Sequence, residues 1–421
     1  MKKLILVVAG LVLMAFLPQA ALAQNAGYDG GFFIKNDDES FKLNIGGNLQ
    51  TNLFWEKDPC RTNPNVECPN GQVGDPGNKN SYMSFQVRRA TLGLRAFFND
   101  IVDVGFTLKH AMSSAGNRTF ATVQVDGATA AVAVIPEFVV TLGMVGLPLD
   151  IMGEASSSWY LLPESPITNS QDDGGLVTPD GSTIERSAFG APSGLGINFA
   201  GAYWKWFYSV SVVNAAESDY NLNDNKRFSF GMRTGFNILG DIVGGSMSDF
   251  ACSETPNLTI SVGSDYQAKR WLDIPIPGGP PAPTTPVLVN YMWTSSLGVG
   301  LRWAGLAFTT EGYYRRTKLG STAPTSLLYY RNSLTDIGYY AALGYYAIPK
   351  KFEIAVQAAQ IFRQGPDNNS YGFGGGLNYY IFDNNLKLQL AYTLLADFDA
   401  TPNVAGAAKT HNITLRAQAK F

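Results

Sequence analysis

Basic side chains recur on one face of several extended segments of this chain. In the segment 81–98, Arg89 and Arg95 alternate with Leu92 and Leu94, so charged and apolar groups point in opposite directions. The same two-residue period assigns further cations to the polar faces of later segments: Lys109, Arg227, Arg233, Arg315, Lys387, Arg416 and Lys420. Such side chains around a water-filled passage favour anions, and the planar guanidinium fits oxyanions. The pattern predicts electrostatic selection of anions, without a covalent step.

Acidic residues are fewer on these polar faces, and the clear ones are Asp103, Glu311 and Glu353. A second interpretation is therefore that charges of both signs solvate the passage and pair across it. One cation conflicts with strict alternation, because Arg88 falls on the apolar face of its segment. A β-bulge at this position, or a side chain that reaches the membrane interface, accounts for it.

Sixteen segments with a period of two must position these side chains. The last of them, 411–421, alternates apolar and polar residues without a fault and ends on Phe421. An outer-membrane β-barrel repeats this pattern around its circumference, because lipid contacts one face and water the other. We therefore predict an all-β fold, a transmembrane antiparallel β-barrel of about sixteen strands over 41–421. A β-sandwich or propeller is the other all-β possibility, but the chain has no internal repeat.

Short and long connections alternate along the chain. The short ones have the length and composition of turns and fall at 99–100, 135–137, 202–204, 304–305, 348–351 and 383–385. Short periplasmic turns and long outward loops are typical of outer-membrane barrels. The exception is the link 238–256, which is long where a short one is due. Aromatic residues beside the short turns predict a girdle at one membrane interface: Trp204, Trp206, Trp303, Tyr345, Tyr346, Tyr379 and Tyr380.

Residues 1–23 have the features of a secretory signal peptide. Lysines at positions 2 and 3 precede an apolar stretch over 4–17, and the Ala-Leu-Ala sequence of 21–23 is a small-residue cleavage site. We expect cleavage after about Ala23, export to an oxidising compartment, and a short periplasmic segment over 24–40 before the barrel. No later segment has 18 consecutive apolar residues, so no transmembrane helix is expected.

Composition excludes several kinds of site. The formal charge of −3 includes the two lysines of the signal, so the mature chain is near −5 and is not a basic nucleic-acid binder. Cys60 and Cys68 lie in one loop segment and are a plausible disulfide, which leaves Cys252 over. The two histidines, His110 and His411, are not spaced as metal ligands, and no Cys-x-x-Cys-His motif for haem occurs. We expect no metal and no cofactor.

The link 146–193 is too long for a hairpin and contains the apolar run ASSSWYLLPES. A barrel of about sixteen strands has a wide, water-filled interior. We expect this link to fold inward as a constriction loop that sets the size limit. A surface loop is the alternative.

Two other classes of function are weaker. An outer-membrane hydrolase needs a nucleophile and a base, and His110 with Ser113 and Ser114 is the only nearby set. No acid completes it, so we expect no enzyme. A barrel that sheathes a cytochrome in an electron-transfer complex is the other possibility, but an inward-folded 146–193 would block its lumen.

The order of several blocks resembles the phosphate-selective porin O and P family. These blocks are FKLNIGGNLQ, FQVRRATLGLRAFFND, VTLGMVGLPLD, SSSWYLLPESPI and ERSAFGAPSGLGINFAG, and they cover nearly the whole mature chain. The resemblance implies a sixteen-stranded barrel, an inward-folded third loop and arginines along the passage, with Arg89, Arg95 and Arg186 at the matching positions. It also implies a homotrimer in outer-membrane lipid. The expected solutes are small oxyanions such as phosphate, selenite or tellurite, although the third loop contains no lysine.

Overall fold

The computed structural model describes residues 25–28, 31–57, 82–115, 118–169, 189–214, 226–241, 245–274, 285–319, 333–364, 369–396 and 409–421. The proposed signal peptide, the Cys60 and Cys68 pair, and Arg186 lie outside these ranges. Within them, no helix is long and apolar enough to cross a membrane.

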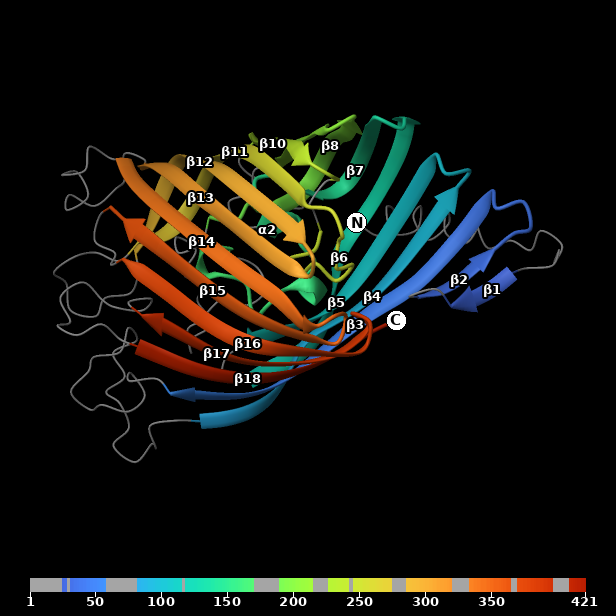
Figure 1. The fold of residues 1–421 in the computed structure, drawn as a ribbon. Coiled ribbons are helices and arrows are strands. Elements are labelled where there is room, and N and C mark those ends of the chain that lie inside the picture. The colour runs from blue at the N-terminus through green and yellow to red at the C-terminus, as the bar shows by residue number, and fades with distance from the viewer. Residues whose placement is uncertain are drawn as a thin grey trace.

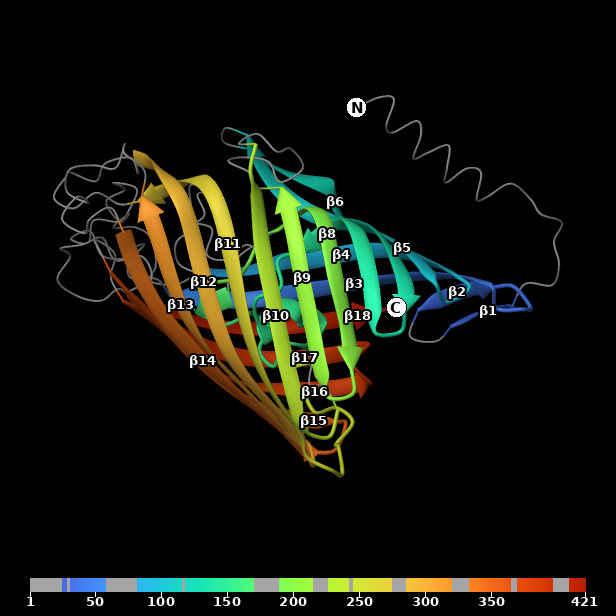
Figure 2. The same ribbon diagram turned by 90° about the horizontal axis from the view of Figure 1, so that it is seen from above.

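Sixteen antiparallel strands form a closed barrel, as predicted (Figures 1 and 2). In chain order they are β3 (Phe41–Lys57), β4 (Tyr82–Phe98), β5 (Val102–Ala115), β6 (Arg118–Ile135), β7 (Phe138–Gly146), β8 (Ser193–Tyr203), β9 (Trp206–Asn214), β10 (Phe228–Leu239), β11 (Asn257–Ile274), β12 (Thr285–Trp303), β13 (Leu306–Leu319), β14 (Ser333–Ile348), β15 (Phe352–Arg363), β16 (Ser370–Phe382), β17 (Leu386–Ala396) and β18 (Lys409–Lys420). Each strand pairs with its neighbours in sequence, so every connection is a simple up-and-down link.

The barrel closes where β18 pairs with β3, from His411 opposite Lys57 to Lys420 opposite Asn48. Beyond the strand, Phe421 exchanges backbone hydrogen bonds with Gly47, at 2.7 and 3.0 Å. A Cβ atom at Gly47 would lie 2.6 Å from the Phe421 ring, so only glycine allows this approach. The terminal aromatic residue is thus part of the closing seam.

A short hairpin precedes the barrel in the stretch 24–40, for which the sequence predicted a short periplasmic segment and no particular strand. It consists of β1 (Asn25–Tyr28) and β2 (Phe32–Lys35), and β2 pairs with β3 opposite 42–45. Figure 1 places this hairpin beside the first residues of β3, near the C-terminus. It continues the sheet on the edge of β3 that β18 leaves uncovered.

Strict alternation explains why these segments are strands. On β17, Lys387 and Gln389 face inward and are at most 1% exposed, whereas the outward Leu388 and Leu390 are 39% and 46% exposed. One face therefore suits lipid and the other a polar interior. Short turns join the strands, and Asn99 and Asp100 both have positive φ (50° and 54°), as a two-residue hairpin turn requires.

The aromatic girdle is only partly as predicted. Trp204, Trp303 and Tyr345 face outward beside short turns and are 79%, 49% and 50% exposed. Trp206 and Tyr379 also face outward beside short turns and are exposed. Tyr346 and Tyr380, however, are inward and at most 3% exposed. Adjacent residues of a strand point to opposite faces, so only one member of each Tyr-Tyr pair can face lipid.

Candidate functional site

The link between β7 and β8 enters the barrel and lies against its inner surface. Its described residues, 147–169 and 189–192, are called the inner loop below. They include α2 (Ile151–Glu154) and two single turns, η2 (Ser157–Trp159) and η3 (Ile167–Asn169). Both views place α2 within the ring of strands (Figures 1 and 2).

A glutamate of the barrel wall fixes the start of the inner loop. Glu311 of β13 accepts hydrogen bonds from the backbone N–H groups of Ile151 (2.7 Å) and Met152 (3.1 Å), which open α2. The Tyr340 hydroxyl donates to the same carboxylate at 2.7 Å. A helix N-terminus exposes unsatisfied donors, and a carboxylate there satisfies them.

Polar side chains of the wall also hold the irregular backbone of the inner loop. Lys387 donates to the Ser158 carbonyl at 2.6 Å, and Asn378 donates to the Leu161 carbonyl at 2.9 Å. Buried carbonyls outside regular structure need such donors. The polar inward residues of β16 and β17 therefore bind a protein segment.

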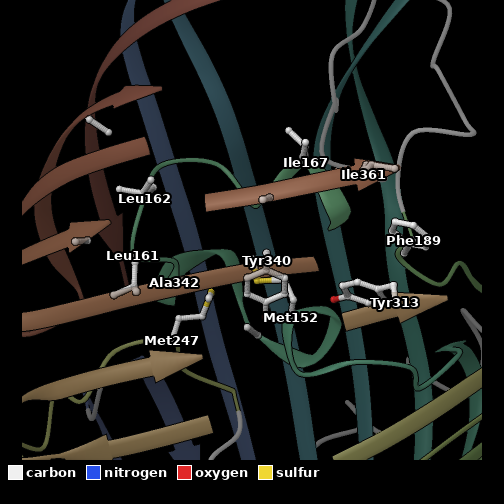
Figure 3. Close-up of a cluster of buried hydrophobic side chains, with 14 residues drawn as sticks. Met152, Leu161, Leu162, Ile167, Phe189, Met247, Tyr313, Tyr340, Ala342 and Ile361 are labelled. Atoms are coloured by element: carbon white, nitrogen blue, oxygen red, sulfur yellow. The ribbon is translucent and has the colours of Figure 1, made fainter. Parts of the chain in front are cut away.

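The apolar run of the inner loop fits into sockets lined by glycine. Leu161 and Leu162 are 1% and 2% exposed. A Cβ atom at Gly344 would lie 2.7 Å from Leu161 Cδ2, and one at Gly376 would lie 2.8 Å from Leu162 Cδ2. Figure 3 shows the cluster that these leucines join, with Met152, Ile167, Phe189, Met247, Tyr313, Tyr340, Ala342 and Ile361. The run thus buries its apolar surface inside the barrel rather than in water.

Three arginines of the wall surround Glu164 of the inner loop. Arg88 binds both carboxylate oxygens, at 2.9 and 2.8 Å, and Arg416 Nη2 lies 2.5 Å from Oε1. Arg89 Nη2 lies farther away, at 3.7 Å. The Glu164 side chain is 44% exposed, but its carboxylate lies among protein atoms, and this burial raises its pKa. The positive charges of Arg416, Arg88 and Arg89 have the larger opposite effect and lower the pKa to about 2.

A bulge in β4 brings Arg88 to this cluster. The pairing of β4 with β3 shifts register between Gln50 and Thr51, and the shift skips Arg88. Arg88 and Arg89 consequently both bind Glu164 inside the barrel. Of the two explanations offered by the sequence, the bulge is confirmed.

A second ion pair joins the inner loop to the opposite part of the wall. Arg233 of β10 bonds Glu154, the last residue of α2, and the Arg233 guanidinium also lies 5.1 Å from the Phe207 ring. The arginine side chain is 1% exposed and the glutamate side chain 42%. As with Glu164, the carboxylate is the partner that reaches solvent.

The unexplained link 238–256 also turns inward. Ser248 Oγ donates to Glu353 at 2.8 Å, and Asp249 accepts from the Gly305 N–H at 2.8 Å. Phe250 packs 5.9 Å from the Trp159 ring of the inner loop, centroid to centroid. Residues 245–253 thus form a second inner segment that contacts the first.

The predicted site residues fall into three groups. Arg89 and Arg233 contact the inner loop as described, and Arg315, 1% exposed, lies 4.9 Å from the ring of its Phe189. Arg95 and Lys109 instead form ion pairs within the wall, with Asp103 and Asp126. Arg227 is exposed just before β10, and Arg186 lies outside the described residues.

The site also includes residues that the sequence did not single out. Glu154 and Glu164 were missed, and Arg88 and Arg416 were not chosen as site residues. Glu164 directly follows the apolar run of the inner loop, and this position is the one feature of the sequence that could have drawn attention to it. No spacing rule relates position 164 to positions 88 and 416, because closure of the barrel brings them together.

The inner wall has a covered and an open part. Inward residues of β13–β18 are mostly buried, and Glu311, Tyr340 and Lys387 are at most 1% exposed. Inward residues of β5–β7, such as Thr107 and Thr141, keep intermediate exposure. The two inner segments therefore lie on one side of the interior, and inward residues of β5–β8, together with Arg95 of β4, stay partly accessible from within.

The fold is shared by solved outer-membrane proteins at low sequence identity. In-vitro folded OmpT of Vibrio cholerae superposes with a TM-score of 0.54 at 11% identity, over 92% of this chain and 99% of that one. Its trimer form gives 0.53 at 10%, over 91% and 100%. An anion-selective porin from Comamonas acidovorans gives 0.53 at 11%, over 90% and 100%. No protein-family model and no curated protein matches the sequence. The chain thus has the sixteen-stranded barrel fold of outer-membrane porins.

Proposed function

We propose that this protein is an outer-membrane porin, a water-filled channel for the passive uptake of small anions. The observation that carries the proposal is the division of the inner wall. The inner loop is fixed to β13–β18 and, through Glu164 and Glu154, to Arg88 of β4 and Arg233 of β10, while inward residues of β5–β8 and Arg95 of β4 keep partial exposure. A closed barrel with an apolar outer face and a partly filled polar interior suits selective passage better than catalysis.

The inner loop is the constriction in this proposal. Its stretch 154–164 crosses the interior between Arg233 of β10, which binds Glu154, and Arg416 of β18, which binds Glu164. A solute would pass between the loop and β5–β8. The Arg95 side chain, 61% exposed, is more accessible than those of Lys109 (36%) and Arg89 (9%).

The preference for anions rests on two supports. Arginine outnumbers carboxylate around Glu164, and the structurally similar Comamonas protein is described as an anion-selective porin. We further infer oxyanions such as phosphate, selenite or tellurite as solutes, because bidentate guanidinium contacts suit their geometry. Arg89, Arg95, Lys109, Arg186, Arg227, Arg233 and Arg315 remain the proposed selecting residues, and of these we expect the exposed Arg95 to contribute more than the buried Arg315.

Location and assembly complete the proposal. Export by a cleaved signal over 1–23 would deliver the chain to the outer membrane, with 24–40 and the short turns on the periplasmic side. A homotrimer is proposed because a structural neighbour has a trimer form. A sheath around a cytochrome is less suitable, since the two inner segments occupy part of the interior.

Planar-bilayer recordings test the channel. Purified protein should conduct, and its reversal potential in a KCl gradient should indicate anion preference that weakens as salt screens the lumen. The folded protein should also migrate faster in SDS gels before heating than after it. A cation-selective channel would overturn the assignment of the lumen, and recovery from the soluble periplasm would overturn the barrel in a membrane.

A further inference from the structure

Two buried carboxyl groups meet at the start of the inner loop. Asp150, directly before α2, and Glu311 of β13 are 2% and 1% exposed. Both bind the same turn of backbone, because Asp150 Oδ1 accepts from the Gly153 N–H at 2.6 Å and Glu311 accepts from those of Ile151 and Met152. The attachment of the inner loop to the wall at this point therefore depends on two acids.

The hydroxyl group of Tyr313 joins the two carboxyl groups. Its oxygen lies 3.0 Å from Asp150 Oδ2, 3.1 Å from Glu311 Oε2 and 3.1 Å from Asn169 Oδ1. A tyrosine hydroxyl has one hydrogen to donate, so with both carboxyl groups ionised only one of these three contacts has a hydrogen between its oxygens. The other two would bring lone pairs together.

The side-chain amide of Asn169 does not supply the missing hydrogen. Its Nδ2 donates to Asp150 Oδ2, and its Oδ1 accepts from the Thr168 hydroxyl at 2.8 Å, so the amide oxygen is the atom that faces Tyr313. One added proton on either carboxyl group joins the two acids. The Tyr313 oxygen then accepts from the protonated carboxyl group and donates to the ionised one.

Neither acid forms a salt bridge with a cation among the described residues. Arg233 attracts Asp150 only from a distance, because its ion pair is with Glu154. The ionisable groups around the pair are Tyr313 of β13, Tyr340 of β14, Arg302 of β12, Arg233 of β10 and Glu154 of α2. The pair is thus held by hydrogen-bond donors and not by a neutralising charge.

Two ionised carboxylates in this position are unfavourable. Burial disfavours the charged form and raises the pKa of Asp150, while its hydrogen bonds and the charge of Arg233 act in the opposite direction. A second negative charge at the same hydroxyl adds repulsion, and such pairs release their protons in two separate steps. Once one of the two groups has ionised, its charge keeps the proton on the other.

We propose that Asp150 and Glu311 share one proton at neutral pH, and that its loss in alkaline solution drives the start of the inner loop away from β13 into the passage. The inference rests on the proposed function and adds regulation to the same constriction. Hydroxide takes up the proton and becomes water, and the two carboxylates that remain repel each other across the Tyr313 hydroxyl. Because Asp150 belongs to the loop and Glu311 to the strand, their separation moves α2 toward β5–β8. The channel is open at neutral pH and closes in alkali.

Glu353 of β15 provides a matched control. It is also a wall glutamate, 0% exposed, and it holds the second inner segment through Ser248 at 2.8 Å. Its other partners, Asn378 and Tyr380, are donors, and no second carboxylate contacts them within the described part of the chain. Glu353→Gln therefore removes a buried wall carboxyl group without removing a shared proton.

The experiment compares wild type, Glu311→Gln, Asp150→Asn and Glu353→Gln in planar bilayers in KCl, as the pH is raised from 7 to 10. The mean current of the wild type and of Glu353→Gln should fall about twofold or more through closures, in a single one-proton step. Glu311→Gln and Asp150→Asn keep the shape of the pair and remove one ionisation, so they should stay open. Infrared spectra of the purified wild type should show a protonated carboxyl band at pH 7 that disappears over the same range and is missing from both variants.

A closing step that persists in Glu311→Gln and Asp150→Asn would overturn the proposal and assign the titration to another group, such as Lys387. A wild type without the step would also overturn it. If neither variant assembles, the infrared band of the wild type decides, because its absence at pH 7 means that both carboxyl groups are ionised. A wild type that conducts at no pH contradicts the proposed function, whereas a conducting wild type without the band contradicts only the shared proton.

Discussion

The inner faces of β4–β8 and of β13–β18 follow the same alternating pattern, yet their side chains differ in solvent exposure. On β13–β18, the inward residues Glu353 and Arg315 are at most 1% exposed, because the two inner segments cover them. On β4–β8, Arg95 and Lys109 keep 61% and 36% side-chain exposure. A polar inward residue therefore has one of two roles, and the strand alone does not say which.

The difference extends to the chemistry of the charges. On the open wall, Arg95–Asp103 and Lys109–Asp126 join neighbouring strands, and ion pairs with this exposure contribute about 0–1 kcal/mol. On the covered wall, Glu311 and Lys387 bind backbone groups of the inner loop. Losing one of these would leave a buried group without its partner, which costs about 1–3 kcal/mol or more.

The largest expected effect comes from removing the part of the inner loop that covers the wall. Deleting residues 155–185 should raise single-channel conductance severalfold, since residues 155–169 fill part of the wide interior of a sixteen-stranded barrel. The deletion should also weaken competition by phosphate or selenite. Single-channel recordings measure both, with a deletion within 320–331 as the control. Unchanged conductance would place 155–185 outside the passage and leave selectivity to the wall arginines.

A single substitution in the wall should weaken the packing of the inner loop without removing the loop. Gly344→Val places side-chain atoms where Leu161 now lies, since a Cβ there would be 2.7 Å from Leu161 Cδ2. Overpacking of this kind costs about 1–3 kcal/mol. We expect more frequent current fluctuations and unfolding at a lower temperature in heated gel samples. Gly312→Val is the control, because no atom lies within 4 Å of a Cβ at Gly312. If the two variants behave alike, Gly344 is not needed for the packing of Leu161 against the wall.

Most of the fold follows from the sequence because alternation and turn chemistry are local. The count of sixteen strands and the short turn at Asn99 and Asp100 were both predicted and are confirmed. The hairpin β1–β2 was missed, since two four-residue strands carry too little alternation to detect. Tyr346 was assigned to the outer girdle by its place beside a turn, when its parity already pointed inward.

The candidate site was less predictable because its contacts join distant parts of the chain. Parity placed Arg89 and Arg233 on the inner face, but it did not indicate that Glu164 and Glu154 would bind them. Those pairings depend on the path of the inner loop through the barrel. The sequence therefore predicted the cations of the wall and overlooked the carboxylates that the loop brings to them.

Substituting single arginines should affect ion selectivity on the open wall more than on the covered wall. Arg95→Gln removes an accessible cation of the open wall and should shift the reversal potential in a KCl gradient toward cations. Arg315→Gln removes a buried cation beside the Phe189 ring and should lower stability with little change in that potential. The double variant Arg89→Gln and Arg95→Gln should give the larger loss of anion preference. A potential that responds to Arg315→Gln as strongly as to Arg95→Gln would contradict the division of the wall.

The smallest expected effect is the response of the inner loop to acid. The pKa of Glu164 is lowered from 4.5 to about 2, because the attraction of its three arginines outweighs burial. A depressed pKa stabilises the folded protein above pH 4.5, and this contribution is lost as the pH falls toward 2. Between pH 7 and pH 4 the contacts of Glu164 should persist, so wild type and Glu164→Gln should change conductance in parallel. The comparison cancels the titration of acids on the open wall, which both proteins share. If wild-type conductance rises with a midpoint near pH 4.5 and the variant shows no such step, Glu164 titrates as an ordinary carboxyl group and the three arginines do not hold it.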